Sequence, residues 1–303
     1  MTKSEPPHLD PRQQMWQHVH RELVKYAKPD SRFHYDFLHF TPDFHNSALA
    51  VDRLVQLPAY RTASTLLVTP ENSLEELRYR ALKDGKKLVV GTYRLRRGFV
   101  LLNPARIEEK DLRVASWLDG MERQGIGRHL SLAQLQDEHI SVDLCVLGGL
   151  VFNTNGIVVF EGHGLFEIQW ALFKEMKLLR PNTPCAAIAH DSQLVDETKL
   201  GLDAFSPDKP GEVQCDYILT PDKTFEIKEP VRPSSGLNFD ALDPEGLENI
   251  PPLQELKGIR MMEQIMESDR FGANNEKASE MPLSPDEQAG ISMVERIMQG
   301  FKM

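Results

Sequence analysis

The chain has 303 residues, enough for one large domain or two of ordinary size. Its hydrophobic fraction of 41% can supply a core, and its formal net charge of -10 argues against a nucleic-acid-binding protein, because such proteins usually carry a basic face. We find no apolar signal segment at the N-terminus and no run near the roughly 18 apolar residues of a membrane helix. The three cysteines lie far apart, without metal-site spacing, so we expect a reducing compartment, the cytosol.

Residues 1–11 hold three prolines and are expected to form a flexible leader, after which helical and strand patterns alternate. In the first part of the chain we predict a helix from Pro11, a helix over 45–57, a strand over 62–70, a helix from Ser73 to Gly85 and a strand over 86–93. Ser73 and Glu76 would form the capping box of the helix that begins at Ser73. A short helix or turn over 115–126 and a strand over 142–152 that ends in a Gly-Gly turn are expected next, followed by a helix over 164–178, a strand over 183–191 and a strand with a turn over 214–227.

This alternation predicts an α/β domain over residues 12–230, with a mainly parallel sheet flanked by helices. Ligands of such sheets bind at the carboxyl ends of the strands. The loops of interest are therefore those that directly follow strands, at residues 91–99, 148–156, 190–193 and 219–223.

Residues 231–303 differ in character from the rest of the chain. A linker with prolines and glycines comes first, and two Met-rich amphipathic helices are expected to follow. The second helix is predicted to begin at Ser284, with Glu287 completing a capping box. Apolar helix faces need burial, so we expect this helical tail to pack in cis or to bind a protein partner.

The loop after the second predicted strand, TYRLRRGF, concentrates positive charge in an acidic protein. Arginine binds phosphate or carboxylate through two parallel hydrogen bonds. In an extended segment Arg94 and Arg96 would share a face, and Arg97 would lie on the other. We name Arg94 and Arg96 as candidate catalytic residues; the alternative is a solvated basic loop.

The segment AHDSQ follows a predicted strand and brings His190 and Asp191 together. Such a pair can transfer a proton or hold a metal ion, so both are candidate catalytic residues and Asp191 is a candidate metal ligand. In the alternative interpretation, His190 is a core residue and Asp191 caps the next turn. The sequence contains no GxSxG and no HExxH motif, which argues against the corresponding hydrolases.

The stretch NGIVVFEGHGLFEIQWALF places Gly162, His163 and Gly164 between a strand and a helix. Glycines in this position let backbone N–H groups approach a phosphate. Neither GxxxxGK[ST] nor GxGxxG is present, and Glu161 and Glu167 would repel a bare phosphate. These acids would suit a phosphate whose charge is carried by Mg²⁺, which takes oxygen ligands.

These segments, taken in order, carry a resemblance to a known family. The chain from Arg12 to Pro230 resembles the 5-formyltetrahydrofolate cyclo-ligase family, and within it a divergent branch of methenyltetrahydrofolate-synthetase-domain-containing proteins. The segments that carry the resemblance are QQMW, PENSLEELRYRALKDGKKLVV, TYRLRRGF, VDLCVLGGLVFNTNG, GHGLFEIQWALF, AHDSQLVD and CDYILTP.

The resemblance implies a fold like that of the ribose-5-phosphate isomerase and CoA-transferase group. It also implies ATP- and Mg²⁺-dependent conversion of 5-formyltetrahydrofolate to 5,10-methenyltetrahydrofolate. In that reaction ATP phosphorylates the formyl oxygen, and the folate N10 then attacks and expels phosphate. The protein would act mainly by positioning the reactants and neutralising phosphate charge.

The family signature reads approximately G-R-x-G-x-G-x-G-Y-Y-D-R. By this resemblance Gly162, His163 and Gly164 bind the nucleotide, Glu167 replaces the Mg²⁺-binding aspartate, and Arg12 is the N-terminal basic residue that helps to bind ATP. The two signature arginines fall on apolar residues, Val158 or Ile157 and Ile168.

Two functions are therefore expected from the sequence. One is a ligase for 5-formyltetrahydrofolate or a related one-carbon or pterin compound, with Arg94, Arg96 or Arg97 supplying the missing charge. The other is a catalytically degenerate nucleotide- or folate-binding module that acts as a regulatory or scaffold protein. A different enzyme on the same fold, with His190 as acid or base, is a further alternative.

Overall fold

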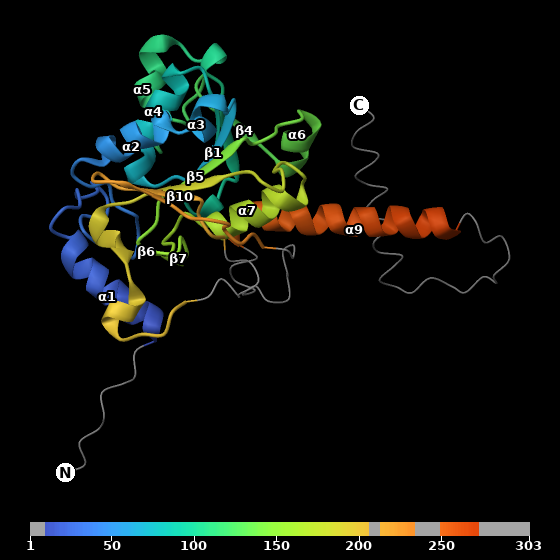
Figure 1. The fold of residues 1–303 in the computed structure, drawn as a ribbon. Helices are drawn as coiled ribbons and strands as arrows, with labels where there is room; N and C mark the ends of the chain where they lie inside the picture. Colours follow the sequence, from blue (N-terminus) through green and yellow to red (C-terminus); the bar gives the residue numbers. More distant parts are fainter. Residues whose placement is uncertain (1–9, 206–212, 234–248, 273–303) are drawn as a thin grey trace. The chain divides into compact units, whose positions relative to one another are not determined.

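An eight-stranded sheet forms the centre of the structure, a computed structural model that describes residues 10–205, 213–233 and 249–272 (Figure 1). The strand order is β11-β10-β8-β5-β1-β2-β3-β4. The five strands from β10 to β2 are parallel, and β11, β3 and β4 pair antiparallel at the edges. The mainly parallel sheet predicted from the sequence is confirmed.

The strands of the large sheet are β1 Thr65–Val68, β2 Lys87–Gly91, β3 Phe99–Leu102, β4 Arg128–Leu130, β5 Leu144–Leu147, β8 Cys185–Ile188, β10 Tyr217–Leu219 and β11 Thr224–Glu226. A second sheet contains β6 Val151–Asn153, β7 Val158–Phe160 and β9 Leu194–Val195. The helices are α1 Pro11–Leu23, α2 Ser47–Gln56, α3 Pro58–Thr62, α4 Glu75–Lys83, α5 Leu112–Ala115, α6 Leu132–Asp137, α7 Phe166–Glu175 and α9 Pro251–Gly272.

Both faces of the large sheet are covered, as the continuous apolar runs of its strands require. Leu66 and Val68 of β1 share one buried cluster with residues of α2 and α4. On the other face α7 packs on β3, where the ring of Phe173 meets that of Phe99 at 4.9 Å. The side chain of Gln169 in α7 lies against Gly91, the last residue of β2, where an added Cβ would be 2.9 Å from its Nε2.

Helix α1 packs on the small sheet rather than on the large one. Its buried residues Met15, Val19 and Leu23 recur at helical spacing and join the cluster that contains residues of β6 and β7. The indole of Trp16 stacks on Phe160 at 5.6 Å. This contact places α1 beside the strand that leads into the glycine turn.

Local details differ from the sequence-based predictions at two places, a predicted capping box and a predicted strand. Ser73 lies in a short 3-10 turn and does not cap α4, and Glu76 pairs instead with Arg80 and Arg113. The predicted strand over 142–152 is two strands, β5 and β6. They belong to different sheets because the chain turns between them at Gly148–Gly149.

The chain forms two compact units, residues 1–257 and residues 258–303, so the predicted tail is divided between them. In the first unit Leu253 and Leu256 are buried, and the carboxylate of Glu255 accepts hydrogen bonds from the amides of Leu132 (2.9 Å) and Ala133 (3.0 Å) at the start of α6. The first turns of α9 therefore pack in cis. The predicted helix from Ser284 lies outside the described residues, and a protein partner stays a prediction.

Replacing Glu255 by alanine is expected to lower the free energy of unfolding by about 1 kcal/mol, because two amides at the start of α6 lose their acceptor. Urea unfolding curves of the whole chain measure this change. Lys257→Ala, an exposed position on the same helix, is the matched control and should leave the midpoint unchanged. Equal midpoints for the two variants would contradict the capping role.

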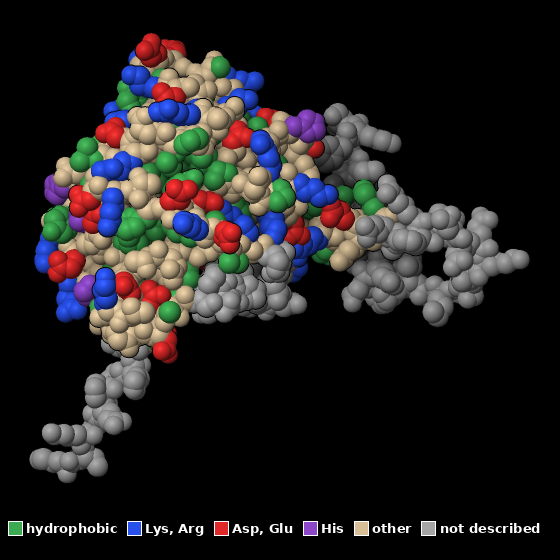
Figure 2. Space-filling model, in the orientation of Figure 1, with side chains coloured by type: hydrophobic (Ala, Val, Ile, Leu, Met, Phe, Trp, Pro, Cys, Tyr) green, Lys and Arg blue, Asp and Glu red, His purple; other side chains and the backbone are tan. Residues whose placement is uncertain are grey.

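Acidic and basic side chains are interspersed on the face of the molecule that Figure 2 shows. Among the described residues, none of the helices combines the length and the apolar character needed to cross a membrane.

Candidate functional site

The glycine turn follows β7 and precedes α7, as the sequence predicted, and it lies against the end of β1. Gly162 has a φ of +83°, a conformation that L side chains rarely adopt. A Cβ at Gly164 would lie 1.9 Å from Oε1 of Glu71. The side-chain amide of Gln169 donates to the carbonyl of Gly164 at 2.6 Å and fixes the turn from within α7. Glycine is thus required here by the close approach of Glu71.

Glu71, two residues beyond Thr69 at the end of β1, is a buried carboxyl group. The amide of Gly148 donates to Oε2 at 3.4 Å, and Oε1 has no hydrogen-bond partner among the described residues. Burial raises the pKa of Glu71 from 4.5 to about 7. A carboxyl group with this pKa is partly protonated at neutral pH, so it can donate or accept a hydrogen bond.

The loop that carries Glu71 is held by the buried guanidinium of Arg78. This side chain donates to the carbonyls of Thr69 (3.1 Å), Glu71 (3.1 Å) and Ser116 (2.7 Å). Three bonds from one planar donor fix the backbone, so the Glu71 side chain points to the glycine turn from a rigid base.

Two further carboxylates belong to the glycine turn. The amide of Glu167 donates to Oε1 of Glu161 at 3.2 Å. Burial, followed by the nearby charges of Glu167 and Glu71, raises the pKa of Glu161 well above 4.5. Burial and these charges therefore favour the protonated form of Glu161, so the negative charge of the turn is smaller than its three carboxyl groups would suggest.

Arg94 reaches the glycine turn from the loop after β2. This loop is not extended, because Arg94 has a φ of 52° in the turn Tyr93–Leu95. The shared face that an extended segment would give Arg94 and Arg96 is therefore not formed. Its Nη2 lies 2.9 Å from Nε2 of His163, and its buried Nε has no hydrogen-bond partner among the described residues. Arg96 is exposed, and Arg97 forms an ion pair with Glu122.

The imidazole of His163 lies between Arg94 and the backbone carbonyl of Leu38, and both contacts involve its Nε2. Burial lowers the pKa of His163, which favours the neutral ring. One nitrogen of a neutral ring either donates or accepts, so a bond to the Leu38 carbonyl leaves no acceptor for Arg94. The guanidinium of Arg94 therefore keeps donor capacity for a ligand.

Glu71, His163 and Gly164 line a cavity of about 20 Å³, whereas Arg94 is not among its lining residues. Thr41 adds another buried side-chain oxygen that has no hydrogen-bond partner in the described part of the chain. Buried polar atoms are almost always paired, so the unpaired oxygens of Glu71 and Thr41 at one cavity indicate a candidate ligand site. The cavity is lined by Arg32, Phe40, Thr41, Pro70, Glu71, Asn72, Tyr93, Leu118, His163 and Gly164.

His190 and Asp191 lie at the end of β8, a strand separated from β1 by β5. Nδ1 of His190 accepts from the amide of Ser192 at 3.1 Å, and the ring stacks on Tyr26 at 4.3 Å. Oδ1 of Asp191 accepts from the hydroxyl of Thr220 at 2.5 Å. His190, rather than Asp191, thus caps the next turn. Burial lowers the pKa of His190.

Arg12 lies on the other side of the glycine turn, beside β7. Its guanidinium donates to the carbonyl of Val159 at 2.9 Å and lies 5.5 Å from the ring centre of Phe205. The structure thus brings Arg12 to the strand that enters the glycine turn, where its guanidinium binds a backbone carbonyl.

The two predicted metal ligands have different neighbours, Glu167 beside Glu161 and Asp191 beside Thr220. In the described ranges no group of three or more His, Cys, Asp and Glu side chains could hold a metal ion. Mg²⁺ often binds through one or two carboxylates together with substrate phosphates. Since burial favours the protonated form of Glu161, Glu167 is the candidate ligand of the turn.

Glu71, Thr41 and Arg78 were missed by sequence reasoning. The rule that ligands bind beyond the ends of parallel strands would have found Glu71, since PENS directly follows the first strand. Thr41 lies in a stretch without periodicity and carries no such signal.

The pH dependence of stability tests the state of Glu71. Its raised pKa means that the folded chain keeps a proton that the unfolded chain releases above about pH 4.5, so stability is expected to fall as pH rises from 4.5 to 7. The loss from this one group is on the order of 3 kcal/mol. Urea unfolding across this range should show a shallower fall for Glu71→Gln, whereas Glu108→Gln, an exposed control, should keep the wild-type fall. Identical profiles for wild type and Glu71→Gln would contradict this assignment.

A polar pocket at the carboxyl ends of parallel strands, beside a glycine turn and a helix start, lies where α/β proteins with such sheets bind their ligands. Residues 13–203 match the model of the 5-formyltetrahydrofolate cyclo-ligase family, and the chain belongs to this family.

Several relatives are similar over most of this chain. The methenyltetrahydrofolate synthase domain-containing protein of Homo sapiens is 28% identical over 251 residues, which cover 82% of this chain and 61% of that protein. The protein of the same description from Mus musculus is 28% identical over 221 residues, covering 72% and 56%. The matches thus span little more than half the length of these curated relatives.

Among solved structures, the chain is similar to the NMR structure of Aquifex aeolicus 5,10-methenyltetrahydrofolate synthetase, with a TM-score of 0.41 and 14% identity. That match covers 77% of this chain and 100% of the other.

Proposed function

We propose that this chain is a divergent ligase that uses ATP and Mg²⁺ to convert 5-formyltetrahydrofolate, or a related one-carbon or pterin compound, to its methenyl form. The observation that carries the proposal is the set of unpaired buried polar atoms, Nε of Arg94, Oε1 of Glu71 and Oγ1 of Thr41, beside the glycine turn. Membership of the cyclo-ligase family supplies the reaction class.

In this proposal Arg94 neutralises phosphate charge that the apolar residues Val158 and Ile168 cannot. Gly162 and Gly164 let the backbone approach the phosphates. Glu71, with its proton, hydrogen-bonds a polar edge of the folate-like substrate. Glu167 would hold Mg²⁺, which supplies charge neutralisation at the phosphates when bound.

The remaining assignments stay predictions. They are charge neutralisation by Arg96, ATP binding by Arg12, proton transfer by His190 and metal binding by Asp191, together with a cytosolic location.

A second candidate function is a nucleotide- or folate-binding module without turnover, acting as a regulatory or scaffold protein. It is favoured by the composition of the turn, which has apolar residues, Val158 or Ile157 and Ile168, where the family signature has arginines. Family membership alone does not imply activity.

One experiment separates the two. Purified protein is mixed with ATP, Mg²⁺ and 5-formyltetrahydrofolate, and both the methenyl absorbance and ADP release are followed. Growth of both signals supports the ligase. Binding of ATP or folate by calorimetry without either signal supports the binding module, and absence of both turnover and binding contradicts the two proposals together.

A further inference from the structure

The cavity beside Glu71 and Gly164 is too small for the ligands proposed for it. Its volume is about 20 Å³, close to that of one water molecule, whereas pockets for small organic ligands typically measure roughly 300–1,000 Å³. A ligand can therefore reach the unpaired groups only after part of the wall moves.

The wall segment that closes the cavity is held by hydrogen bonds to backbone carbonyls. The hydroxyl of Tyr93 donates to the carbonyl of His39 at 2.8 Å, and Nε2 of His163 contacts the carbonyl of Leu38. Phe40 then lines the cavity. Tyr93 and His163 belong to the loops that flank the cavity, so these bonds join the segment to the site itself.

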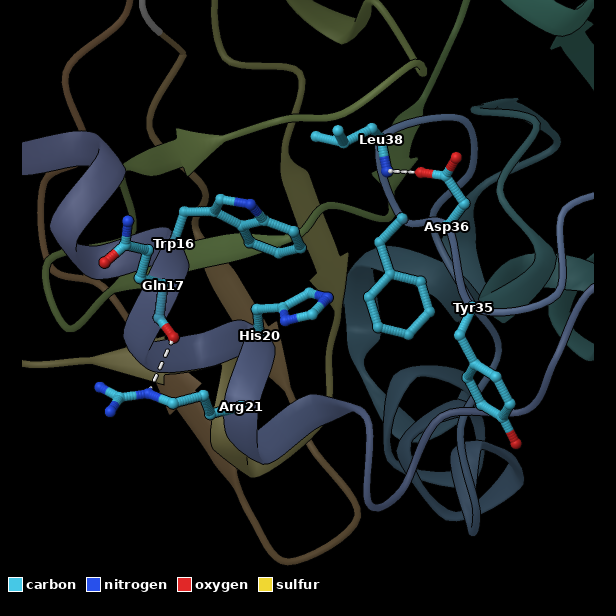
Figure 3. Close-up of a pocket in the computed structure, with 8 residues that line it drawn as sticks. Trp16, Gln17, His20, Arg21, Tyr35, Asp36 and Leu38 are labelled. Atoms are coloured by element: carbon cyan, nitrogen blue, oxygen red, sulfur yellow. Dashed lines mark hydrogen bonds between the residues drawn. The ribbon is translucent and has the colours of Figure 1, made fainter.

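Behind the same segment lies a larger groove of about 480 Å³. Figure 3 shows Trp16, Gln17 and His20 of α1 on one side and Tyr35 and Leu38 on the other. The side chain of Leu38 is 60% exposed although the apolar ring of Trp16 faces the same groove. The groove therefore offers both room and an apolar surface for Leu38.

The ends of the segment are anchored more firmly than its middle. Phe37 is buried, and its ring meets that of His20 at 5.6 Å. Before it, the backbones of Asp30 and His34 are paired by hydrogen bonds of 2.9 and 2.8 Å. Displacement can thus begin after Phe37, and to open the cavity it must also move the buried ring of Phe40, which packs on the ring of Phe37 at 5.5 Å and belongs to the cluster that contains the buried residues of α1.

We propose that residues 38–40 form a lid that opens by releasing Tyr93 and His163 and swinging Leu38 into the groove against Trp16. In the closed state two carbonyls are hydrogen-bonded and Leu38 is exposed; in the open state those carbonyls meet water and Leu38 is buried. Such an exchange of polar for apolar contacts gives two discrete states. The nature of the ligand admitted rests on the proposed function, whereas the opening itself does not.

The test measures opening without any ligand. Thr41 is 4% exposed on the cavity side of the lid, so the thiol of a Thr41→Cys variant reacts with a maleimide only when the lid opens. The native cysteines are buried, and the labelling rate of Cys185, read by peptide mass spectrometry, reports global unfolding.

Two added substitutions should move the rate in opposite directions. Tyr93→Phe removes one hydrogen bond of the closed lid and is expected to speed labelling at position 41 roughly fivefold. Gln17→Trp fills the groove and should slow it, whereas Gln13→Trp, an exposed position of α1 outside the groove, should not. In every variant the labelling of Cys185 should stay constant.

The lid proposal is contradicted if neither Tyr93→Phe nor Gln17→Trp changes the labelling rate at position 41. It is also contradicted if that rate changes in parallel with the labelling rate of Cys185. If Thr41→Cys does not fold, hydrogen exchange at the amides of Leu38 and His39 in otherwise native chains gives the same comparison. Because no ATP or folate is present, a negative result here leaves the proposed function standing, and absence of turnover leaves the lid standing.

Discussion

Replacing Arg94 by alanine is expected to lower kcat/KM for ATP-dependent turnover of 5-formyltetrahydrofolate roughly 100- to 1,000-fold, the usual effect of losing one preorganised cationic or hydrogen-bond donor. Arg94 is the arginine of its loop that reaches the glycine turn, through His163, with a buried Nε left unpaired among the described residues. Arg94→Lys should recover little, because an ammonium group lacks the guanidinium fork.

Arg96→Ala is the matched control for this prediction, since Arg96 is exposed in the same loop. Steady-state kinetics at saturating Mg²⁺ should give nearly wild-type values for this variant. A large loss on Arg96→Ala with normal turnover by Arg94→Ala would reverse the assignment. Equal small losses for both would indicate that neither arginine replaces the positive charge missing from the glycine turn.

Gly164→Ala is expected to abolish most turnover, at least roughly 100-fold, and to lower the free energy of unfolding by about 1–3 kcal/mol. A Cβ at this position would lie 1.9 Å from Oε1 of Glu71, far inside contact distance. Arg78 holds the backbone of Glu71 through its carbonyl, so either the buried carboxyl group of Glu71 must turn away from the glycine turn or the turn itself must shift, and both changes disturb the site.

The control for the glycine substitution is Gly258→Ala, where an added Cβ meets no atom within 4 Å. Turnover assays and thermal unfolding of both variants check the prediction. Wild-type turnover by Gly164→Ala would show that the close contact between Glu71 and the glycine turn is not needed for activity. It would contradict the assignment of this contact to the active site.

Much of the fold followed from the sequence because its signals are local. The Thr-, Leu- and Val-rich run of β1 is buried along its whole length, and Gly85, with a φ of +77°, ends the helix region as predicted. The antiparallel edge strands β3 and β4 were not predicted. β4 has only 3 residues, two of which are exposed, so its segment shows no apolar run.

The site was predictable only in part. The glycine turn stood out because two glycines flank one histidine, and its position after β7 could be read from the apolar run. The direction of Arg94 could not be read, since it depends on a positive φ at a residue other than glycine. Nor could the pairing of Glu71 with Gly164, which are 93 positions apart and meet only because β1 ends beside α7.

His190 illustrates a different limit of sequence reasoning. A histidine followed by aspartate at a strand end suits proton transfer, yet its Nδ1 accepts from the amide of Ser192 and its ring is stacked on Tyr26. These contacts give the ring a capping role that the sequence pattern does not distinguish from catalysis. Ser73 shows the converse case, where a capping pattern is present and the helix begins elsewhere.

The most direct test of the central claim is a crystal structure of the whole chain with ATP and Mg²⁺. We predict phosphate density at the turn Gly162–Gly164, with the guanidinium of Arg94 turned from His163 onto the phosphate and residues 38–40 displaced toward α1. Phosphates bound elsewhere, with Arg94 still at His163 and the cavity beside Glu71 unchanged, would contradict the claim that this pocket is the active site.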